Sequence, residues 1–242
     1  MDEDLNRAWA EKRYDVVIKI AERLLESDPT DLGTYARCIY SYNQLGDSDS
    51  SMRTARKAME NTVDSPPIIN SLGDLIWDSG YLSEALIVYE KAYALVQLKP
   101  DTYHQAGEIL YNIGCVQFQK GEFEQSVDTF RQVLQMPPEK SQASENLPLM
   151  LGQALIKIGK LEEALPHLNS YVEKNSEDIK GCLLLGDTYY ALEHIEQAQQ
   201  CWQHVLRLDN SAYVAKAKRR YWTYRGKSQR RWWHKKEDLF DY

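Results

Sequence analysis

Residues 110–138 read LYNIGCVQFQKGEFEQSVDTFRQVLQMPP. Apolar residues recur every three or four positions on both sides of Gly121, a spacing typical of two amphipathic helices joined by a turn. The pair Pro137 and Pro138 follows the second run and predicts its end, because proline cannot continue a helix. The segment therefore reads as helix, turn, helix and stop.

The same pattern returns along the chain. A small residue after an apolar one in the first helix is followed twelve, sixteen and nineteen positions later by residues suited to the second helix. The four sets are Gly73 with Ala85, Tyr89 and Ala92; Gly114 with Ser126, Phe130 and Val133; Gly152 with Ala164, Leu168 and Tyr171; and Gly186 with Ala198, Trp202 and Val205.

A turn residue recurs with the repeat. It is Gly46, Gly80, Gly121 and Gly159, and Glu193 takes the place in the last copy. The spacings are 34, 41, 38 and 34 residues, so the base period is 34 with short insertions. A fixed period of this length indicates a repeat architecture.

This pattern resembles the tetratricopeptide repeat, whose signature has Leu-Gly and Tyr in the first helix, Ala and Phe in the second, and a closing Pro. The resemblance implies an all-α, right-handed superhelical solenoid of antiparallel helix pairs over residues 1–212. The expected units are 1–31 (partial), 32–65, 66–99, 107–140, 145–178 and 179–212. Ile39 and Ser48 depart from the pattern, and Pro166 falls inside a second helix.

Two segments follow the repeats. Residues 213–225 place apolar residues on one helical stripe and are expected to form a capping helix for the last unit. Residues 226–242 form a basic-aromatic C-terminal tail. Residues 213–242 hold 10 Lys/Arg and 3 Asp/Glu, a charge of +7, whereas residues 1–212 carry −14. The chain is an acidic body with a basic end.

Composition narrows the class of protein further. The 242 residues are 43% apolar, which excludes disorder over most of the chain, and no apolar run is long enough to span a membrane. The N-terminal segment lacks the features of a secretory signal. The four cysteines are far apart without a Cys-x-x-Cys motif, as expected of reduced thiols. These features predict a cytoplasmic protein.

A search for catalytic motifs yields no phosphate loop, dinucleotide fingerprint, nucleophile elbow or zinc-protease motif. Cys201, His204 and His194 form the nearest approach to a metal site, without an evident fourth ligand. Glu162 and Glu163 follow an inter-helix turn, where negative charge suits a helix N-terminus. We therefore expect a protein that is not an enzyme and that needs no cofactor or metal.

The resemblance also implies a binding surface, since the first helices of such repeats line a concave groove that receives peptides. The implied groove residues are Arg37, Tyr40, Asn43, Asn70, Asp74, Trp77, Tyr111, Phe118, Asn146, Gln153, Lys180, Asp187 and Tyr190. The set lacks the Lys/Asn/Arg cluster with which some members clamp the acidic C-terminus of chaperones, so that partner is disfavoured. Mixed aromatic, amide and acidic groups suit an extended or helical segment with apolar anchors.

Two questions stay open at this point. Trp77, Phe118 and Tyr190 either anchor a ligand or pack between adjacent first helices. The basic end either seals the last repeat, binds nucleic acid, or lies on an anionic membrane. Its contact residues would be Arg219, Arg220, Arg230, Arg231, Trp232, Trp233, Lys235 and Lys236.

The sequence thus predicts a non-enzymatic scaffold or adaptor that binds a peptide segment or helix of another protein within a larger complex. The alternative is a nucleic-acid or membrane adaptor that acts through the tail.

Overall fold

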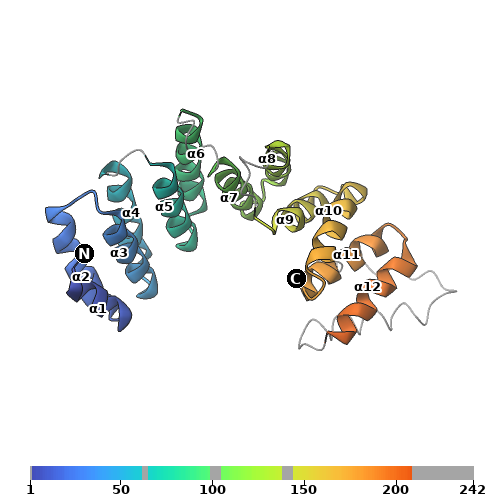
Figure 1. Ribbon diagram of the computed structural model, residues 1–242, viewed down its shortest axis with the longest axis horizontal. Coiled ribbons are helices and arrows are strands. Elements are labelled where there is room, and N and C mark those ends of the chain that lie inside the picture. The colour runs from blue at the N-terminus through green and yellow to red at the C-terminus, as the bar shows by residue number, and fades with distance from the viewer. Residues whose placement is uncertain (1, 62–64, 99–104, 138–143, 209–242) are drawn as a thin grey trace. The chain divides into compact units, whose positions relative to one another are not determined.

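A computed structural model describes residues 2–61, 65–98, 105–137 and 144–208. The described residues form twelve α-helices and no strand, which confirms the all-α prediction (Figure 1). The helices are α1 Glu3–Ala10, α2 Tyr14–Ser27, α3 Leu32–Gln44, α4 Ser48–Asn61, α5 Pro66–Asp78, α6 Leu82–Leu98, α7 Ala106–Gln119, α8 Phe123–Gln135, α9 Leu147–Lys157, α10 Leu161–Lys174, α11 Ile179–Ala191 and α12 Ile195–Arg207.

The predicted turns lie between the two helices of each pair. The four turn glycines have φ between 76° and 84°, and Glu193 has φ 66°. This left-handed region is open to glycine and costly for other residues, which explains the choice of glycine at four of the turns. The first pair also turns through a positive φ, at Lys12 with 55°, which lies 34 residues before Gly46 and so occupies the equivalent turn.

The predicted small residues lie against large side chains of the second helix. A Cβ built on Gly73 would meet Tyr89 at 2.5 Å, and one on Gly152 would meet Leu168 at 2.6 Å. On Gly186 it would meet Trp202 at 2.7 Å. These glycines are required because only a residue without a side chain lets the two helices approach so closely.

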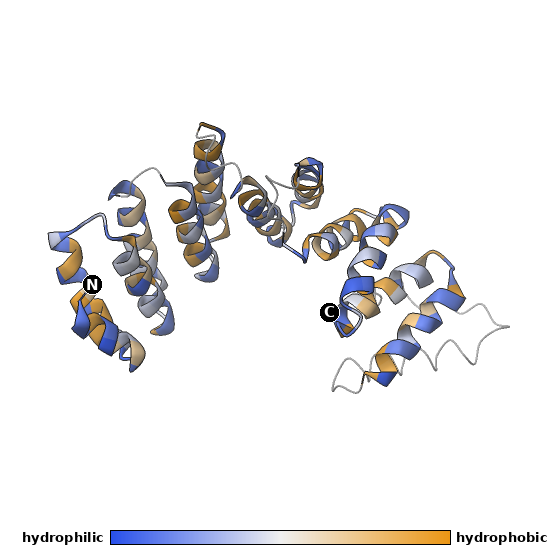
Figure 2. Ribbon diagram, in the orientation of Figure 1, coloured by the Kyte–Doolittle hydropathy of each residue, from blue (hydrophilic) through white to orange (hydrophobic). Residues whose placement is uncertain are grey.

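The described chain divides into two compact units. The first holds the residues up to Glu122 and again from Gln132, and the second holds Phe123–Arg131 and the residues from Ser144 onward. In the first unit α2 packs on α3, α3 on α4, α5 on α6 and α6 on α7; in the second, α9 packs on α10, α10 on α11 and α11 on α12. Figure 2 shows hydrophobic and hydrophilic residues sharing each helix, as expected of helices with one buried stripe.

Helices α4 and α5 of the first unit make few contacts with each other. Helix α5 packs closely on α6 but contacts α3 and α4 over little of its length. Three of the buried residues of α4, Ser51, Ala55 and Ala58, follow Ile39 by twelve, sixteen and nineteen positions and so face α3. On α5, Ile68 and Leu75 are half-buried.

Helix α10 continues through Pro166, as the register required. The expected capping helix 213–225 and the tail 226–242 lie outside the described residues.

Candidate functional site

Three first helices of the first unit, α3, α5 and α7, carry most of the implied groove residues, and all of these are exposed or half-buried except Asn70, which is buried. We call this set the first-helix wall.

A polar network joins α5 to α7. The Asp74 Oδ1 atom accepts a hydrogen bond from the Tyr89 hydroxyl at 2.6 Å and another from Asn112 Nδ2 at 3.2 Å. Asn112 also donates to Asn70 Oδ1 at 3.2 Å, and Asn70 donates to Glu108 Oε1 at 3.4 Å. These amides and carboxyls therefore hold one another in place across two neighbouring first helices.

Negative charge collects on the same helices. Burial raises the pKa of the Asp74 carboxyl above its ordinary value; the hydrogen bond from Tyr89 opposes this, and the nearby Glu108 and Asp78 carboxylates add to it. Among the described residues, the ion pairs of lysine and arginine involve other carboxylates than these three. The α5–α7 part of the wall therefore presents three carboxylates that make no ion pair with a lysine or arginine of the described chain.

Trp77 connects the two helices through its indole. The Nε1 atom donates to Gln119 Oε1 at 2.7 Å, and the ring meets Tyr89 edge-on with centroids 6.3 Å apart. The side chain remains half-buried, as do those of Tyr111 and Phe118 on α7. Trp77 therefore packs between adjacent first helices and also presents surface to solvent.

On α3 the exposed aromatic residue is Tyr40, which is 37% exposed. Its ring meets Trp9 and Tyr14 edge-on, at centroid distances of 5.1 and 6.0 Å. Asn43 donates to the Ser79 hydroxyl at 2.7 Å and so ties the ends of α3 and α5 together. Arg37 is half-buried on the same helix.

The second unit holds the remaining groove residues. Asn146 and Lys180 are exposed and Gln153 is half-buried. Asp187 is fully buried and accepts a hydrogen bond from Trp202 Nε1 at 3.1 Å, and the Tyr190 ring lies 5.6 Å from that indole. Asp187 and Tyr190 therefore contribute to packing between α11 and α12.

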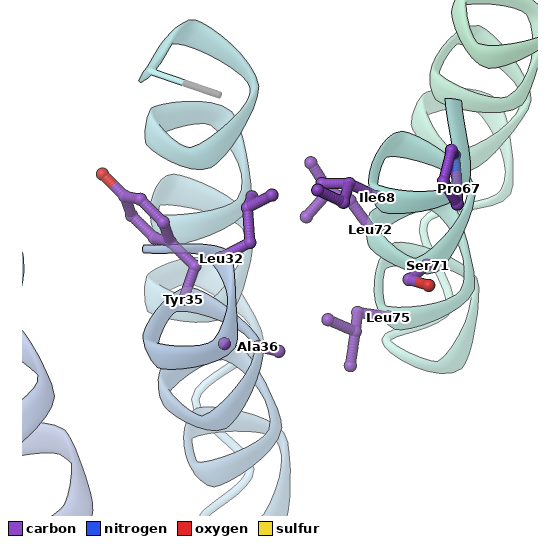
Figure 3. Close-up of a pocket in the computed structure, with 9 residues that line it drawn as sticks. Leu32, Tyr35, Ala36, Pro67, Ile68, Ser71, Leu72 and Leu75 are labelled. Atoms are coloured by element: carbon purple, nitrogen blue, oxygen red, sulfur yellow. The ribbon is translucent and has the colours of Figure 1, made fainter. Parts of the chain in front are cut away.

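An apolar pocket of about 300 Å³ lies between α3 and α5 (Figure 3). Leu32 points from α3 toward Ile68 and Leu72 on α5, and Leu75 faces α3 from the next turn. The full lining, which we call the α3–α5 pocket, is Leu32, Gly33, Tyr35, Ala36, Pro67, Ile68, Ser71, Leu72 and Leu75.

The sequence reasoning missed this pocket. Its residues lie beside the positions that the resemblance assigned to the groove. The available signal was the apolar residues of α5, Ile68 and Leu75, which have no place in the spacing that links each first helix to its own second helix.

The histidine and cysteine candidates do not form a metal site in the described chain. No group of three or more His, Cys, Asp or Glu side chains is close enough there to hold a metal ion. His204 Nε2 lies 2.7 Å from the Ser176 carbonyl oxygen, and His194 lies against the Tyr189 ring. Burial raises the pKa of the Cys201 thiol to about 12, which disfavours the reactive thiolate.

Acidic residues near the turns interact with helix dipoles and form ion pairs. Glu162 and Glu163 occupy the first turn of α10, where the helix dipole favours negative charge. Glu163 also forms ion pairs with Arg131 and Lys160. Glu122 is the N-cap residue of α8 but makes no side-chain capping bond; it pairs with Lys120 instead.

Two further expectations concern membranes and the tail. No helix among the described residues combines the length and the apolar character needed to cross a membrane. The predicted tail residues, from Arg219 to Lys236, lie outside the described residues.

Comparison with known proteins identifies the repeats. Residues 107–140 and 179–211 match the tetratricopeptide repeat family. The chain contains tetratricopeptide repeats. The two matched segments coincide with the fourth and sixth helix pairs, and the other pairs share the positive φ at the turn. Among them, α5–α6 and α9–α10 share the close approach of a glycine to the second helix.

Two curated proteins resemble part of the chain. Protein O-mannosyl-transferase Tmtc3 of Drosophila melanogaster is 24% identical over 106 residues, covering 43% of this chain and 11% of that protein. Tetratricopeptide repeat protein 8 of Caenorhabditis elegans is 24% identical over 151 residues, covering 62% of this chain and 28% of that protein. The chain thus spans about a tenth to about a quarter of these relatives.

Solved structures of repeat proteins share the fold. PilW, a type IV pilus biogenesis factor, superposes with a TM-score of 0.66 at 20% identity, covering 88% of this chain and 94% of PilW. The C-terminal part of a repeat protein from Cytophaga hutchinsonii gives 0.63 at 16%, covering 92% and 88%. YrrB, described as having an unusual peptide-binding site, gives 0.60 at 16%, covering 82% and 97%.

Proposed function

We propose that this protein recruits a peptide segment of another protein to the first-helix wall, as a non-catalytic scaffold or adaptor within a larger assembly. Tetratricopeptide repeats support a protein-interaction scaffold in general. The observation that carries the finer proposal is the network of Asn70, Asp74 and Asn112 beside the partly exposed Trp77.

The chemistry of this network suits a peptide. Amide side chains both donate and accept hydrogen bonds, as the backbone of an extended peptide does. Because the groups already hold one another across α5 and α7, their orientation is set before a ligand arrives, which lowers the entropy that binding must overcome. Trp77 adds a partly exposed aromatic surface of the kind that dominates binding energy at interfaces. Tyr40, Arg37 and Asn43 extend the proposed wall along α3.

In the second unit we propose that Asn146, Gln153 and Lys180 make further polar contacts with a partner. Gln153 and Lys180 lie on first helices and Asn146 is the N-cap residue of one, and all three are exposed or half-buried. Asp187 and Tyr190 are left out of this set because they pack against Trp202.

The test uses a phage-displayed library of short random peptides, panned against the intact protein. Peptides that bind the parent should bind Trp77→Ala about tenfold or more weakly, since a central aromatic contact is worth over 1 kcal/mol. Tyr93→Ala removes a half-buried aromatic residue from α6 and is the matched control. Thermal melts of both variants separate loss of binding from loss of fold.

Binding that is equal in the parent, Trp77→Ala and Phe118→Ala would contradict the proposal, provided that all three melt alike. A library that yields no binder to the parent would also contradict it. The binding site would then have to lie on the second helices or the tail.

The second candidate function rests on the charge of +7 carried by residues 213–242. In this proposal Lys and Arg contact phosphates while Trp232 and Trp233 stack on bases or lie at a membrane interface. Affinity for RNA, DNA or anionic vesicles should fall steeply with added salt, and Gln at Arg230, Arg231, Lys235 and Lys236 should flatten that dependence. Undetectable binding at low salt would exclude the tail function.

We further propose that the protein works in the cytoplasm. All four cysteines are free, and burial raises the pKa of each thiol. Free thiols suit a reducing compartment.

A further inference from the structure

We infer that the partner peptide carries an aliphatic side chain that fills the α3–α5 pocket and a lysine or arginine about two positions away that contacts Asp74 and Asp78. This inference rests on the proposed function and names the chemical class of its ligand.

The lining of the pocket favours an apolar ligand group. Leu32, Ile68, Leu72 and Leu75 face its interior, and Ser71 and the Tyr35 hydroxyl are the polar groups among its lining side chains. A volume of about 300 Å³ is at the lower end of the range for small-ligand sites, roughly 300–1,000 Å³. It suits one or two side chains of a peptide rather than a packed helix. Aliphatic groups bind such a pocket favourably because their apolar surface leaves water.

The lining of the pocket is only partly covered within the protein. Helix α5 contacts α3 and α4 sparsely. Ile68 and Leu75 are half-buried in the described structure. A ligand side chain in the pocket would cover them further.

The carboxylates beside the pocket favour a basic residue as the second group of the ligand. Ser71, Asp74 and Asp78 are spaced i, i+3 and i+7 and share one stripe of α5, so the carboxylates follow directly from the pocket rim. Glu108 of α7 adds a third carboxylate beside Asp74. Arg37 is a cation on α3, half-buried and already engaged within the protein. Three carboxylates against one arginine favour a positively charged ligand group.

The spacing of the two ligand groups follows from helix and strand geometry. One turn of α5 advances about 5.4 Å, and an extended peptide advances about 3.3 Å per residue. A side chain one turn beyond the pocket is therefore reached by the peptide residue about two positions from the aliphatic one. We expect selected peptides to share an aliphatic residue, one variable position and then Lys or Arg, in either chain direction.

The experiment uses peptides selected by the intact parent protein from the random library, with affinities measured by fluorescence polarisation. Ser71→Phe places a ring at the exposed pocket rim, and Asp78→Asn removes an exposed carboxylate without changing its size. The matched controls are Ala94→Phe and Glu90→Gln, which make the same kinds of change at exposed positions of α6. Circular dichroism melts confirm that each variant is folded.

We expect Ser71→Phe to weaken binding about tenfold or more and Asp78→Asn to weaken it about threefold to tenfold, while both controls bind as the parent does. Added salt should weaken the parent complex and have less effect on the complex of Asp78→Asn. Replacing the basic residue of the peptide by Gln should reproduce the effect of Asp78→Asn.

Three outcomes would overturn the inference. Selected peptides that lose affinity with Trp77→Ala but lack the aliphatic and basic pair would refute it and leave the proposed function standing. Peptides insensitive to Trp77→Ala, Ser71→Phe and Asp78→Asn alike would refute both. If a synthetic peptide of residues 213–242 displaces the selected peptides with higher affinity than they have, the occupant is this chain's own basic segment and not a separate partner.

Discussion

Gly73 lies where α5 and α6 approach most closely, with the Tyr89 ring filling the space above it. We expect Gly73→Ala to destabilise the protein by roughly 2 kcal/mol, because an added Cβ would overlap a buried ring. The gain in helix propensity, about 1 kcal/mol, offsets only part of this. Urea unfolding checks the prediction, with Ser71→Ala at an exposed position of the same helix as the control. Equal stability of the parent and Gly73→Ala would show that Tyr89 can move aside.

Asp74 makes stability depend on pH. Its pKa is raised, first because burial disfavours the carboxylate, so the folded chain holds the proton more tightly than the unfolded chain. The stabilisation by protonation is complete below the ordinary value of 3.8 and is lost as the pH rises through the folded pKa. We therefore expect the free energy of unfolding of the parent, relative to Asp74→Asn, to fall as the pH rises through that window. Denaturant melts at several pH values test it, and a difference that rises with pH would contradict it.

At the scale of a helix, α10 contains a proline in its interior and continues through it. Pro166 is the sixth residue of α10, where it has no N–H to donate to the carbonyl of Glu162. Because its side chain is exposed, Pro166→Ala should stabilise the protein by about 1–3 kcal/mol through better helix geometry and one regained hydrogen bond. Ser170→Ala, exposed in the same helix, controls for the gain of alanine. A lower melting temperature for Pro166→Ala would mean that the proline has a packing role.

At the scale of the whole molecule, stability depends on neighbouring pairs. Helix α7 packs on α6, and its residues Ile109, Leu110 and Ile113 are buried. A fragment of residues 107–140 loses that cover, so we expect it to show little helix by circular dichroism and no cooperative melt. The intact chain should be strongly helical and melt cooperatively. A fragment that unfolds with a sharp transition would contradict the nearest-neighbour account.

The structure within each pair was determined by the sequence. The glycines at 46, 80, 121 and 159 predicted the turns, and Glu193 was correctly placed in the equivalent turn, because a left-handed φ is a local requirement. Gly73, Gly152 and Gly186 predicted the close approaches, because a fixed spacing of sixteen residues joins each to the side chain above it. These relations depend on short stretches of chain, which a period of 34 residues records directly.

Relations between pairs were decided only by the tertiary structure. The wall residues Asn70 and Asp74 proved to bond across to Asn112 of the next pair. The α3–α5 pocket lies where α5 contacts α3 and α4 sparsely. Helical periodicity states which side of a helix is apolar, but the neighbour that covers it, and how completely, depends on side-chain volumes more than thirty residues away.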